Sequence, residues 1–547
     1  MSKPIIYQII PRLFANFNET RKRYGTKAEN GCGKLVDIND RALKSIADLG
    51  ATHIWYTGVI RHATAELNSP AITKGLAGSP YAITDYYDVH PDLAKNEAKR
   101  MNEFEALLER THKAGLGVIL DYVPNHVSRE YHSTQKPAGV VDLGENDNPN
   151  WAFSPLNNFY YLPNERFCMD KDLQGYDEYP AKATGNDCFC SHPSENDWYE
   201  TVKLNYGVFY RGGGEKQFNP IPNTWHQMLD IMLFWAGKGI DGLRVDMAEM
   251  VPVEFFEWAI AQVKKRYPKL LFIGECYEPH RYDAYIAAGF DYLYDKVGMY
   301  DYLRNVTSRG YPAEGITQQW MQHTGERLQH MLYFLENHDE QRIASGFFCG
   351  NGACAEPAMI IAATLNTCPV MIYMGQELGE KGMDLEGFSG MDGRTTIFDY
   401  WGVKSLQAWA NKGKYDGAHL SEEQKELRTF YSRLLNIARG NRAVQKGQMY
   451  DLTYAQGEGF NKQLHYAFLR HAGAETLLVV VNFHDREQHI HVRLPNDAFV
   501  YLNMEEKAQA TATDLLRGGK QTVAWNTNQP VEVTLPAWTG VVLKIHN

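Results

Sequence analysis

Short apolar segments alternate with helical segments along the first 376 residues, and this alternation constrains the fold more than any other feature of the sequence. We expect strands near 5–10, 53–57, 117–123, 242–247, 270–276, 290–294, 331–336 and 369–375. Segments such as 117–120 and 369–373 show no polar alternation, as is typical of parallel strands that are buried on both faces. Eight such strands, each followed by a helix, predict an α/β fold, the (β/α)8 TIM barrel.

Capping residues mark several of the predicted helices. Asp40 is expected to cap the helix that follows the first strand, and Asn102 with Glu105 has the spacing of a capping box at the start of another. Ser421 and Gln424 form the same pattern before the last helix of the barrel, which carries an apolar stripe.

Two regions depart from the barrel pattern. The connection after the third strand, 127–205, is rich in Asn, Pro, Asp and aromatic residues and has no sustained helical period, which predicts an inserted subdomain over the C-terminal face of the barrel. Beyond residue 440 the pattern changes to period two, as in 489–494 and 531–535, which predicts a C-terminal antiparallel β-sandwich over 441–547. The barrel itself is assigned to 1–126 and 206–440.

The charge balance argues against two classes of partner. The 547 residues carry a net charge of −11, whereas nucleic acid and anionic membrane surfaces select basic patches. No run of about 18 apolar residues occurs, so no membrane-spanning segment is expected. The N-terminus lacks the long apolar region and the cleavage site of a secretion signal. This favours a cytoplasmic protein, or a periplasmic or secreted one whose signal has been removed.

The eight cysteines do not form a recognisable framework. Cys276 and Cys368 are predicted to be free thiols. Two further pairs are close enough in sequence for a metal site or a disulfide, but neither has CxxC spacing with a second pair. Unpaired thiols are therefore favoured for both of these pairs, Cys188 with Cys190 and Cys349 with Cys354.

Polar residues stand at the C-terminal ends of four predicted strands, in the segments 121–126, 242–246, 274–275 and 337–339. At this end of a parallel barrel, such residues are candidates for a functional site. A single Asp there usually caps the following helix. Three carboxylates at one rim are costly to bring together, so their convergence indicates function. The three are Asp246, Glu275 and Asp339.

Paired carboxylates at neighbouring strand ends suit the cleavage of glycosidic bonds. One acid protonates the leaving oxygen, and the other attacks the anomeric carbon or activates water; a gap of about 5–5.5 Å gives retention and a wider gap gives inversion. The fourth and fifth strands, which carry Asp246 and Glu275, are neighbours in the barrel and are compatible with the shorter gap. Arg244 lies two residues before Asp246, so its side chain points to the same face and can hold that carboxylate ionised.

The four segments resemble the signature segments of the alpha-amylase family, glycoside hydrolase family 13, in order and in position on the strands. The resemblance extends over the barrel, the inserted subdomain and the β-domain. It implies a retaining glycoside hydrolase acting on alpha-glucosidic bonds, with Asp246 as nucleophile, Glu275 as general acid/base and Asp339 as a third carboxylate that binds hydroxyls of the reacting sugar. It also implies substrate contacts from Tyr81, which would stack beneath that sugar, and from His126, Arg244, His338 and Arg342.

Two segments depart from the family pattern. Many alpha-amylases carry Lys-His three and four residues after the nucleophile, where this chain has Glu249 and Met250, so the subsites for the leaving group differ. The segment 203–206, which begins with Lys203, resembles the family's fifth segment only loosely. Linkage preference therefore does not follow from these segments.

The resemblance also implies calcium ligands, but no organic cofactor. Asn125 lies where family members hold calcium between the inserted subdomain and the barrel, and Asn16 and Asn18 lie in a first loop that resembles the start of another calcium site. Hard oxygen ligands suit calcium. However, Lys34 stands at an acidic position of that loop. The alternative is that Asn16 and Asn18 form turns and that Asn125 braces its own loop.

The preferred function is hydrolysis of alpha-1,4-linked glucans of the starch type or of malto-oligosaccharides. A transglycosylase, or a neopullulanase-type hydrolase of alpha-1,6 bonds, would use the same residues with different acceptor subsites. A glucan-binding protein on an inactive fold is disfavoured, because such a protein is expected to have lost one or more of the three acids.

Overall fold

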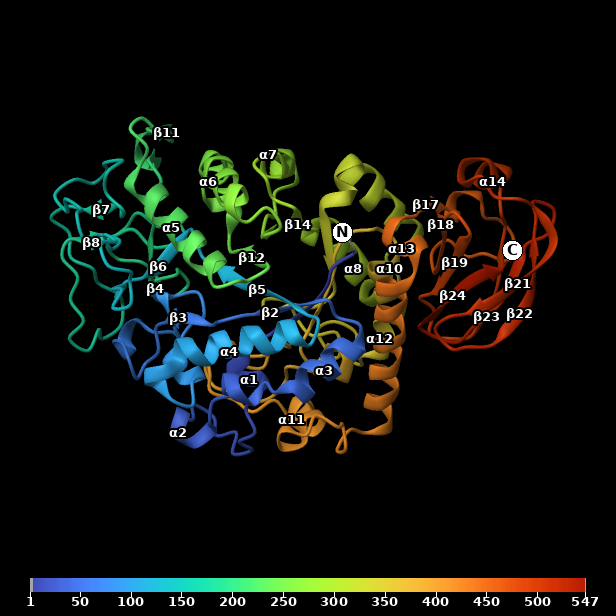
Figure 1. Cartoon of the computed structure of the whole chain (residues 1–547), viewed down its shortest axis with the longest axis horizontal. Helices are drawn as coiled ribbons and strands as arrows, with labels where there is room; N and C mark the ends of the chain where they lie inside the picture. Colours follow the sequence, from blue (N-terminus) through green and yellow to red (C-terminus); the bar gives the residue numbers. More distant parts are fainter. Residues whose placement is uncertain (1–2, 547) are drawn as a thin grey trace.

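Eight parallel strands close into a barrel in the computed structural model, which describes residues 3–546 (Figure 1). Their order around the barrel is β1-β16-β15-β14-β13-β12-β5-β2. Each overlaps one of the eight segments predicted from the sequence, which confirms the predicted fold class. The strands are β1 (Ile5–Ile9), β2 (His53–Tyr56), β5 (Gly117–Tyr122), β12 (Gly242–Val245), β13 (Leu271–Gly274), β14 (Tyr292–Tyr294), β15 (Met331–Phe334) and β16 (Val370–Tyr373).

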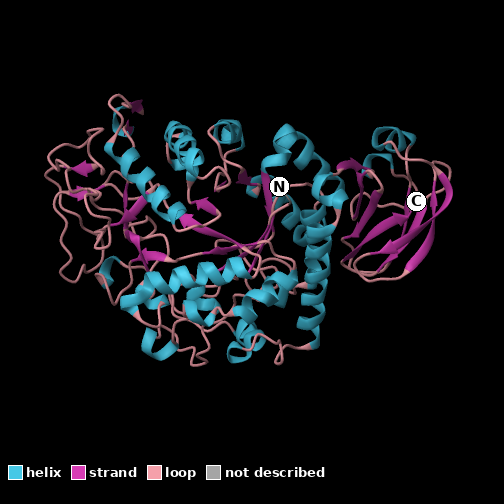
Figure 2. Ribbon diagram, viewed as in Figure 1, coloured by secondary structure: helices cyan, strands magenta, loops and turns pink. Residues whose placement is uncertain are grey.

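Helices lie outside the barrel strands (Figure 2). The longer ones are α3 (Asp40–Leu49), α4 (Arg100–Lys113), α5 (Asn223–Gly237), α6 (Val253–Arg266), α8 (Asp301–Arg309), α10 (Glu356–Thr364), α11 (Lys404–Ala410), α12 (Glu422–Gly440) and α14 (Asn496–Leu502). Shorter ones are α1 (Pro11–Phe14), α2 (Lys27–Asn30), α7 (Tyr282–Ala287), α9 (Ile316–Gln318) and α13 (Arg442–Lys446). A membrane-spanning helix is absent from residues 3–546, since each helix there is too short or too polar for that role.

The barrel strands are buried on both faces. In β1, Ile5 and Tyr7 pack in the large core between strands and helices, whereas Ile6 belongs to a separate cluster with Trp55 and Ile119 from the neighbouring strands β2 and β5. Successive residues of a strand point to opposite faces, so burial of both faces requires apolar residues at consecutive positions. This explains why the strands lack polar alternation.

The capping predictions have mixed outcomes. Ser421 and Gln424 form a reciprocal capping box at the start of α12, as predicted. At α3 the cap is Asn39 rather than Asp40, because the extended residue is Asn39 and its side chain accepts from two amides of the first turn. Helix α4 begins at Arg100, so Asn102 lies inside the helix and caps nothing.

The connection from β5 to α5 forms an irregular subdomain at one end of the molecule (Figure 1). Its strands are short and pair as β6 (His126–Ser128) with β9 (Thr201–Lys203), β7 (Tyr161–Leu162) with β8 (Ala181–Lys182), and β10 (Val208–Phe209) with β11 (Glu215–Lys216). A further pair, β3 (Ile60–His62) with β4 (Ile83–Val89), follows β2. The pairing of β6 with β9 places both ends of the subdomain beside the end of β5.

The C-terminal region is a β-sandwich, as predicted. A six-stranded sheet contains β17 (Gln448–Asp451), β18 (His465–Ala472), β19 (Glu475–Asn482), β24 (Thr539–His546), β21 (Lys507–Asp514) and β22 (Lys520–Trp525), in that order. A ribbon of β20 (Gln488–Val492) and β23 (Val531–Leu535) packs on it. In β19, Leu477 and Val479 pack toward the barrel, whereas Leu478 and Val480 pack toward the ribbon.

One cysteine prediction is wrong. Cys349 and Cys354 form a disulfide with Cα atoms 6.4 Å apart. Between them, the Asn351 side chain accepts hydrogen bonds from the amides of Ala353 and Cys354, and this turn brings the two cysteines together. The predicted free thiols at Cys276 and Cys368 are confirmed, as are the unpaired thiols at 188 and 190.

Candidate active site

The C-terminal ends of the barrel strands open into a cavity of about 510 Å³. The predicted carboxylates Asp246, Glu275 and Asp339 all line it. The inserted subdomain contributes Trp198 and Glu200, and the long loop after β16 contributes Ile397 and Phe398. The structure therefore brings the three acids into one space, walled partly by segments outside the barrel.

Arg244 joins two of these carboxylates. Its Nη1 lies 2.7 Å from Asp246 Oδ1, and its Nη2 lies 2.8 Å from Glu275 Oε2. The register of the barrel produces this arrangement, because β12 pairs with β5 on one side and with β13 on the other. Arg244 is fully buried, so its charge is available to the carboxylates with little screening by water.

Both carboxylate oxygens of Glu275 accept hydrogen bonds. Oε2 accepts from the Met247 amide at 2.8 Å, in addition to its contact with Arg244, and Oε1 accepts from the Tyr277 hydroxyl at 2.5 Å. Met247 has φ 43°, in the left-handed region. A non-glycine residue adopts this conformation at a cost of about 1–3 kcal/mol. The backbone after Asp246 is thus strained where it turns an amide toward Glu275.

Asp339 adjoins a pair of stacked rings. Its Oδ2 lies 3.1 Å from His338 Nε2, which is also 2.6 Å from the Tyr81 hydroxyl. The rings of Tyr81 and His338 stack with centroids 5.2 Å apart, and the other imidazole nitrogen lies 2.8 Å from Gln8 Nε2. Two residues predicted to contact substrate, Tyr81 and His338, therefore lie together at the third carboxylate.

The two predicted histidines are neutral hydrogen-bonding groups. His126, at the start of β6, lines the cavity beside Trp198, with ring centroids 5.2 Å apart. Burial, together with the nearby Lys203, lowers the pKa of His126 to about 3. Burial and then Arg244 lower the pKa of His338 well below its ordinary value. Neither imidazole carries a charge at neutral pH, so both suit the binding of sugar hydroxyls.

The cavity raises the pKa of several carboxyl groups. Burial raises the pKa of Asp246 well above its ordinary range, and the ion pair with Arg244 opposes this and favours the ionised form. Burial and then Glu275 raise the pKa of Asp339 to about 7, although 44% of its side chain is exposed and water screens part of this effect. Burial also raises the pKa of Asp121 to about 6. Such clustering of acids is typical of catalytic sites.

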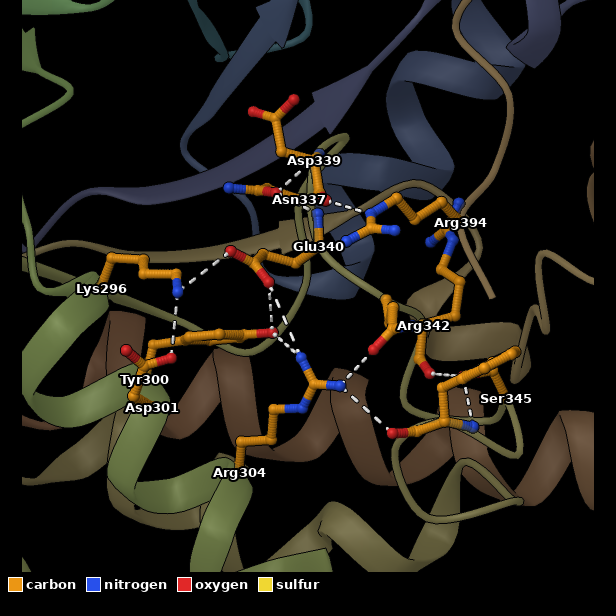
Figure 3. A network of polar contacts seen from close by, with 12 residues as sticks. Lys296, Tyr300, Asp301, Arg304, Asn337, Asp339, Glu340, Arg342, Ser345 and Arg394 are labelled. Atoms are coloured by element: carbon orange, nitrogen blue, oxygen red, sulfur yellow. Dashed lines mark hydrogen bonds and ion pairs between the residues drawn. The ribbon is translucent and has the colours of Figure 1, made fainter. Parts of the chain in front are cut away.

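The structure contradicts the predicted substrate contact of Arg342. Its guanidinium is fully buried, with Nη1 2.7 Å from Glu336 Oε2 and with the ring of Tyr373 beneath it at 4.0 Å. Arg342 therefore neutralises a buried carboxylate below the site. Arg394, by contrast, contacts the backbone of Asp339, because its Nε donates to the Asp339 carbonyl at 2.6 Å (Figure 3).

A second charged cluster lies at the rim of the cavity. Glu340 accepts a hydrogen bond from the Tyr300 hydroxyl at 2.9 Å and lies within 4 Å of both Lys296 and Arg304. The carboxylate of Asp339 points away from this cluster (Figure 3). Lys296 and Glu340 line the cavity and were not predicted.

Three further residues that line the cavity were not predicted from the sequence: Tyr277, Trp198 and Phe398. Tyr277 stands two residues after Glu275 beyond the end of β13, and this spacing was a signal that it could share the face of the acid. Trp198 and Phe398 lie in irregular segments, where no periodicity indicates the direction of a side chain.

A lysine ammonium occupies the position beside Asn125 at which calcium was expected. Lys203 Nζ contacts Asn125 Oδ1 and lies 2.7 Å from Asp187 Oδ1 and 3.0 Å from the Met250 carbonyl oxygen. These oxygens belong to the barrel and to the inserted subdomain. One buried positive charge therefore already joins the two regions, and the residues present do not fit a calcium ion there.

The first loop does not fit a calcium ion either. The Asn16 amide nitrogen donates to the Asn30 and Trp401 carbonyls, and its oxygen accepts from the Asn18 amide at 3.1 Å. Asn18 in turn accepts from the Thr20 amide. These contacts support the alternative, in which both residues form turns. Throughout residues 3–546, no three His, Cys, Asp or Glu side chains are grouped so as to hold a metal ion.

We expect enzyme treated with EDTA to keep its activity and its melting temperature, because the ammonium of Lys203 supplies the positive charge at Asn125. Lys203→Ala should lower the melting temperature, since the Asn125 side-chain oxygen and the Met250 carbonyl lose a charged hydrogen-bond donor, at a cost of about 1–3 kcal/mol. Added calcium should raise the melting temperature of the variant but not of the wild type, by binding to the vacated oxygens. A loss of stability of the wild type in EDTA would contradict this assignment.

Two family models match most of the chain. Residues 8–408 match the family model described as "Alpha amylase, catalytic domain", and residues 461–546 match "Alpha amylase, C-terminal all-beta domain". The chain is 24% identical to neopullulanase 2 of Thermoactinomyces vulgaris, over 98% of this chain and 77% of that protein. It is 25% identical to the oligo-1,6-glucosidase of Heyndrickxia coagulans, over 70% and 68% of the two chains.

The fold is also similar to solved structures. The maltogenic alpha-amylase AmyB of Thermotoga neapolitana aligns with a TM-score of 0.64 at 17% identity, covering 100% of this chain and 99% of that one. The likeness spans all three regions of the molecule, from β1 to β24.

Proposed function

Because this chain belongs to the alpha-amylase family and is a glycoside hydrolase, we propose that it hydrolyses alpha-1,4-glucosidic bonds of starch-type glucans or malto-oligosaccharides. We assign the reaction to a double displacement through a covalent glycosyl-enzyme. The substrate class is supported by the names of the relatives, which include neopullulanase and maltogenic alpha-amylase.

In the first step, protonated Glu275 gives its proton to the glycosidic oxygen as the bond from that oxygen to the anomeric carbon breaks. Asp246 attacks the same carbon from the opposite face and forms an ester. In the second step, ionised Glu275 takes a proton from water as the water oxygen attacks the ester-bearing carbon and releases Asp246. Asp339, with His338 beside it, would bind hydroxyls of the reacting sugar, as would His126 from another part of the cavity wall.

The single observation that carries this proposal is the bridge formed by Arg244. One guanidinium contacts both Asp246 and Glu275 at 2.7 and 2.8 Å. Carboxyl groups that share one guanidinium are close neighbours, which favours the separation of about 5–5.5 Å typical of retaining enzymes over the wider gap of inverting ones. The same bridge favours ionised Asp246, the form that can act as a nucleophile.

We expect the first product released from maltotriose to carry the alpha configuration at its new reducing end. Two displacements at one carbon restore its starting configuration. Proton NMR of the anomeric signals, recorded before mutarotation, measures this directly. Initial release of the beta anomer would contradict the assignment of Asp246 as a nucleophile.

A second candidate function is cleavage of alpha-1,6 bonds. It is favoured by the neopullulanase and oligo-1,6-glucosidase relatives, and by Glu249 and Met250, which stand where many alpha-amylases have Lys-His. Chromatography of the products from soluble starch, maltotriose, isomaltose and pullulan distinguishes the two. Cleavage of maltotriose without cleavage of isomaltose supports the first candidate, and the reverse supports the second.

A further inference from the structure

The proton-donating group of the proposed reaction has one oxygen that can face a leaving group. Glu275 Oε2 is occupied by Arg244 at 2.8 Å and by the Met247 amide at 2.8 Å. Glu275 Oε1 has a single contact, the Tyr277 hydroxyl at 2.5 Å. Both Tyr277 and Glu275 line the cavity. Oε1 is therefore the oxygen that would carry the transferred proton, and Tyr277 is the side chain beside it.

Glu249 fixes the backbone that carries Tyr277. Its Oε2 accepts hydrogen bonds from the amides of Tyr277 and Glu278, at 2.7 and 3.1 Å. Arg281 donates to the Glu249 carbonyl at 2.6 Å, which ties the segment after β13 to the turn after β12. The carboxylate that stands where many alpha-amylases have a lysine thus fixes the backbone of the neighbouring loop.

We propose that Tyr277 is a positioning residue for the acid/base Glu275 and forms the wall of the leaving-group subsite, and that Glu249 holds Tyr277 in place. This inference rests on the proposed function, because it assumes that Glu275 transfers the proton. A lysine in place of Glu249 could accept neither amide hydrogen bond. The position of Tyr277 therefore depends on Glu249, and this contact accounts for the departure of this chain from the family pattern at position 249.

The hydrogen bond to Oε1 strengthens as the reaction proceeds. Oε1 accepts from the Tyr277 hydroxyl throughout, but it gains negative charge as its own proton passes to the glycosidic oxygen. Hydrogen bonds to charged acceptors are stronger than those to neutral ones. An interaction that is stronger in the transition state than in the ground state accelerates the step. Tyr277 would act on Glu275 in this way without itself losing a proton.

The same hydrogen bond affects the pH dependence of the reaction. The groups that face Glu275 come from five strand ends: Arg244, Asp246, Asp121, Tyr294, Asp339 and Tyr277. Of these, only Tyr277 contacts Oε1. A hydroxyl that donates to a carboxylate favours its ionised form. Loss of the hydroxyl therefore favours protonated Glu275, and the pH at which kcat/KM falls on the alkaline side moves upward.

The direct test is Tyr277→Phe, which removes one oxygen and keeps the ring. We expect kcat/KM for maltotriose to fall by about 10- to 100-fold, the usual effect of a lost hydrogen bond to a charged group. We also expect the alkaline limb of its pH profile to move to higher pH. The matched control is Tyr122→Phe, because the Tyr122 hydroxyl, at the end of β5, donates to the Met228 carbonyl at 3.0 Å and does not touch Glu275. Its pH profile should match that of the wild type.

A second series of variants tests the role of Glu249 and leaves Glu275 unchanged. Glu249→Gln keeps an oxygen that can accept from the two amides and should retain most of the activity. Glu249→Ala and Glu249→Lys should both reproduce the shifted alkaline limb of Tyr277→Phe. Adding Tyr277→Phe to either should cause little further shift, because both changes remove the same hydrogen bond.

Two results would overturn the inference. One is a Tyr277→Phe enzyme, with an unchanged melting temperature, whose alkaline limb coincides with that of the wild type. The other is an equal shift in Tyr122→Phe, which would indicate a general loosening of the barrel end. Neither outcome affects the proposed function, which fails separately if Glu275→Gln hydrolyses maltotriose as fast as the wild type.

Discussion

Asp246→Asn should lower kcat for maltotriose by about 10⁴-fold or more, which is the scale of the loss when an enzyme that forms a covalent intermediate loses its nucleophile. The amide keeps the shape of the side chain and an oxygen for Arg244, but it cannot form the ester. Binding of malto-oligosaccharide should persist, because the other cavity residues are unchanged. Isothermal titration calorimetry with the inactive variant measures that binding.

The smaller variant Asp246→Ala gives a sharper test of the nucleophile. It leaves space at the face from which the carboxylate would attack. With alpha-maltosyl fluoride as substrate and sodium azide in solution, the azide ion should take the place of the carboxylate and yield the beta-configured glycosyl azide. Asp121→Asn is the control, because Asp121 also contacts Arg244 but would not attack the sugar. Near wild-type turnover by the Asp246→Asn enzyme would contradict the assignment of Asp246 as the nucleophile.

The barrel was predictable because its physical requirements are local. Strands buried on both faces need consecutive apolar residues, and β1, β5 and β16 show them. The functional end of such strands needs polar residues with no packing role, and Asp246, Glu275 and Asp339 stand out for that reason. The parallel order of the barrel then places their ends at one rim, so three segments far apart in sequence were expected to meet.

The rest of the site depends on contacts that the sequence does not encode locally. Glu249 differs visibly from the family pattern, but its partners are amides nearly 30 residues away, which only the folded barrel brings within reach. Lys203 and Asn125 are separated by 78 residues. Arg342 has the spacing of a substrate-binding arginine, yet its guanidinium pairs with Glu336 in the interior. Residue type and spacing identify a candidate, and burial decides its role.

The second large effect is expected for Glu275→Gln. General acid catalysis by a positioned carboxyl contributes about 10²- to 10⁴-fold, so kcat/KM for maltotriose should fall within that range. The size of the loss should depend on the leaving group. Fluoride departs without needing a proton, so the first step on alpha-maltosyl fluoride should be only slightly slower than in the wild type. Stopped-flow measurement of fluoride release and of maltotriose cleavage compares the two substrates in one variant.

The same variant should accumulate the covalent intermediate. Without an acid/base at position 275, water attacks the ester slowly, while formation of the ester from the fluoride remains fast. We therefore expect a burst of about one fluoride per active site. Mass spectrometry of the quenched enzyme should find the added maltosyl group on a peptide containing Asp246. Equal losses on both substrates would show that Glu275 acts through substrate binding. An adduct on Asp339 would exchange the roles assigned to Asp246 and Asp339.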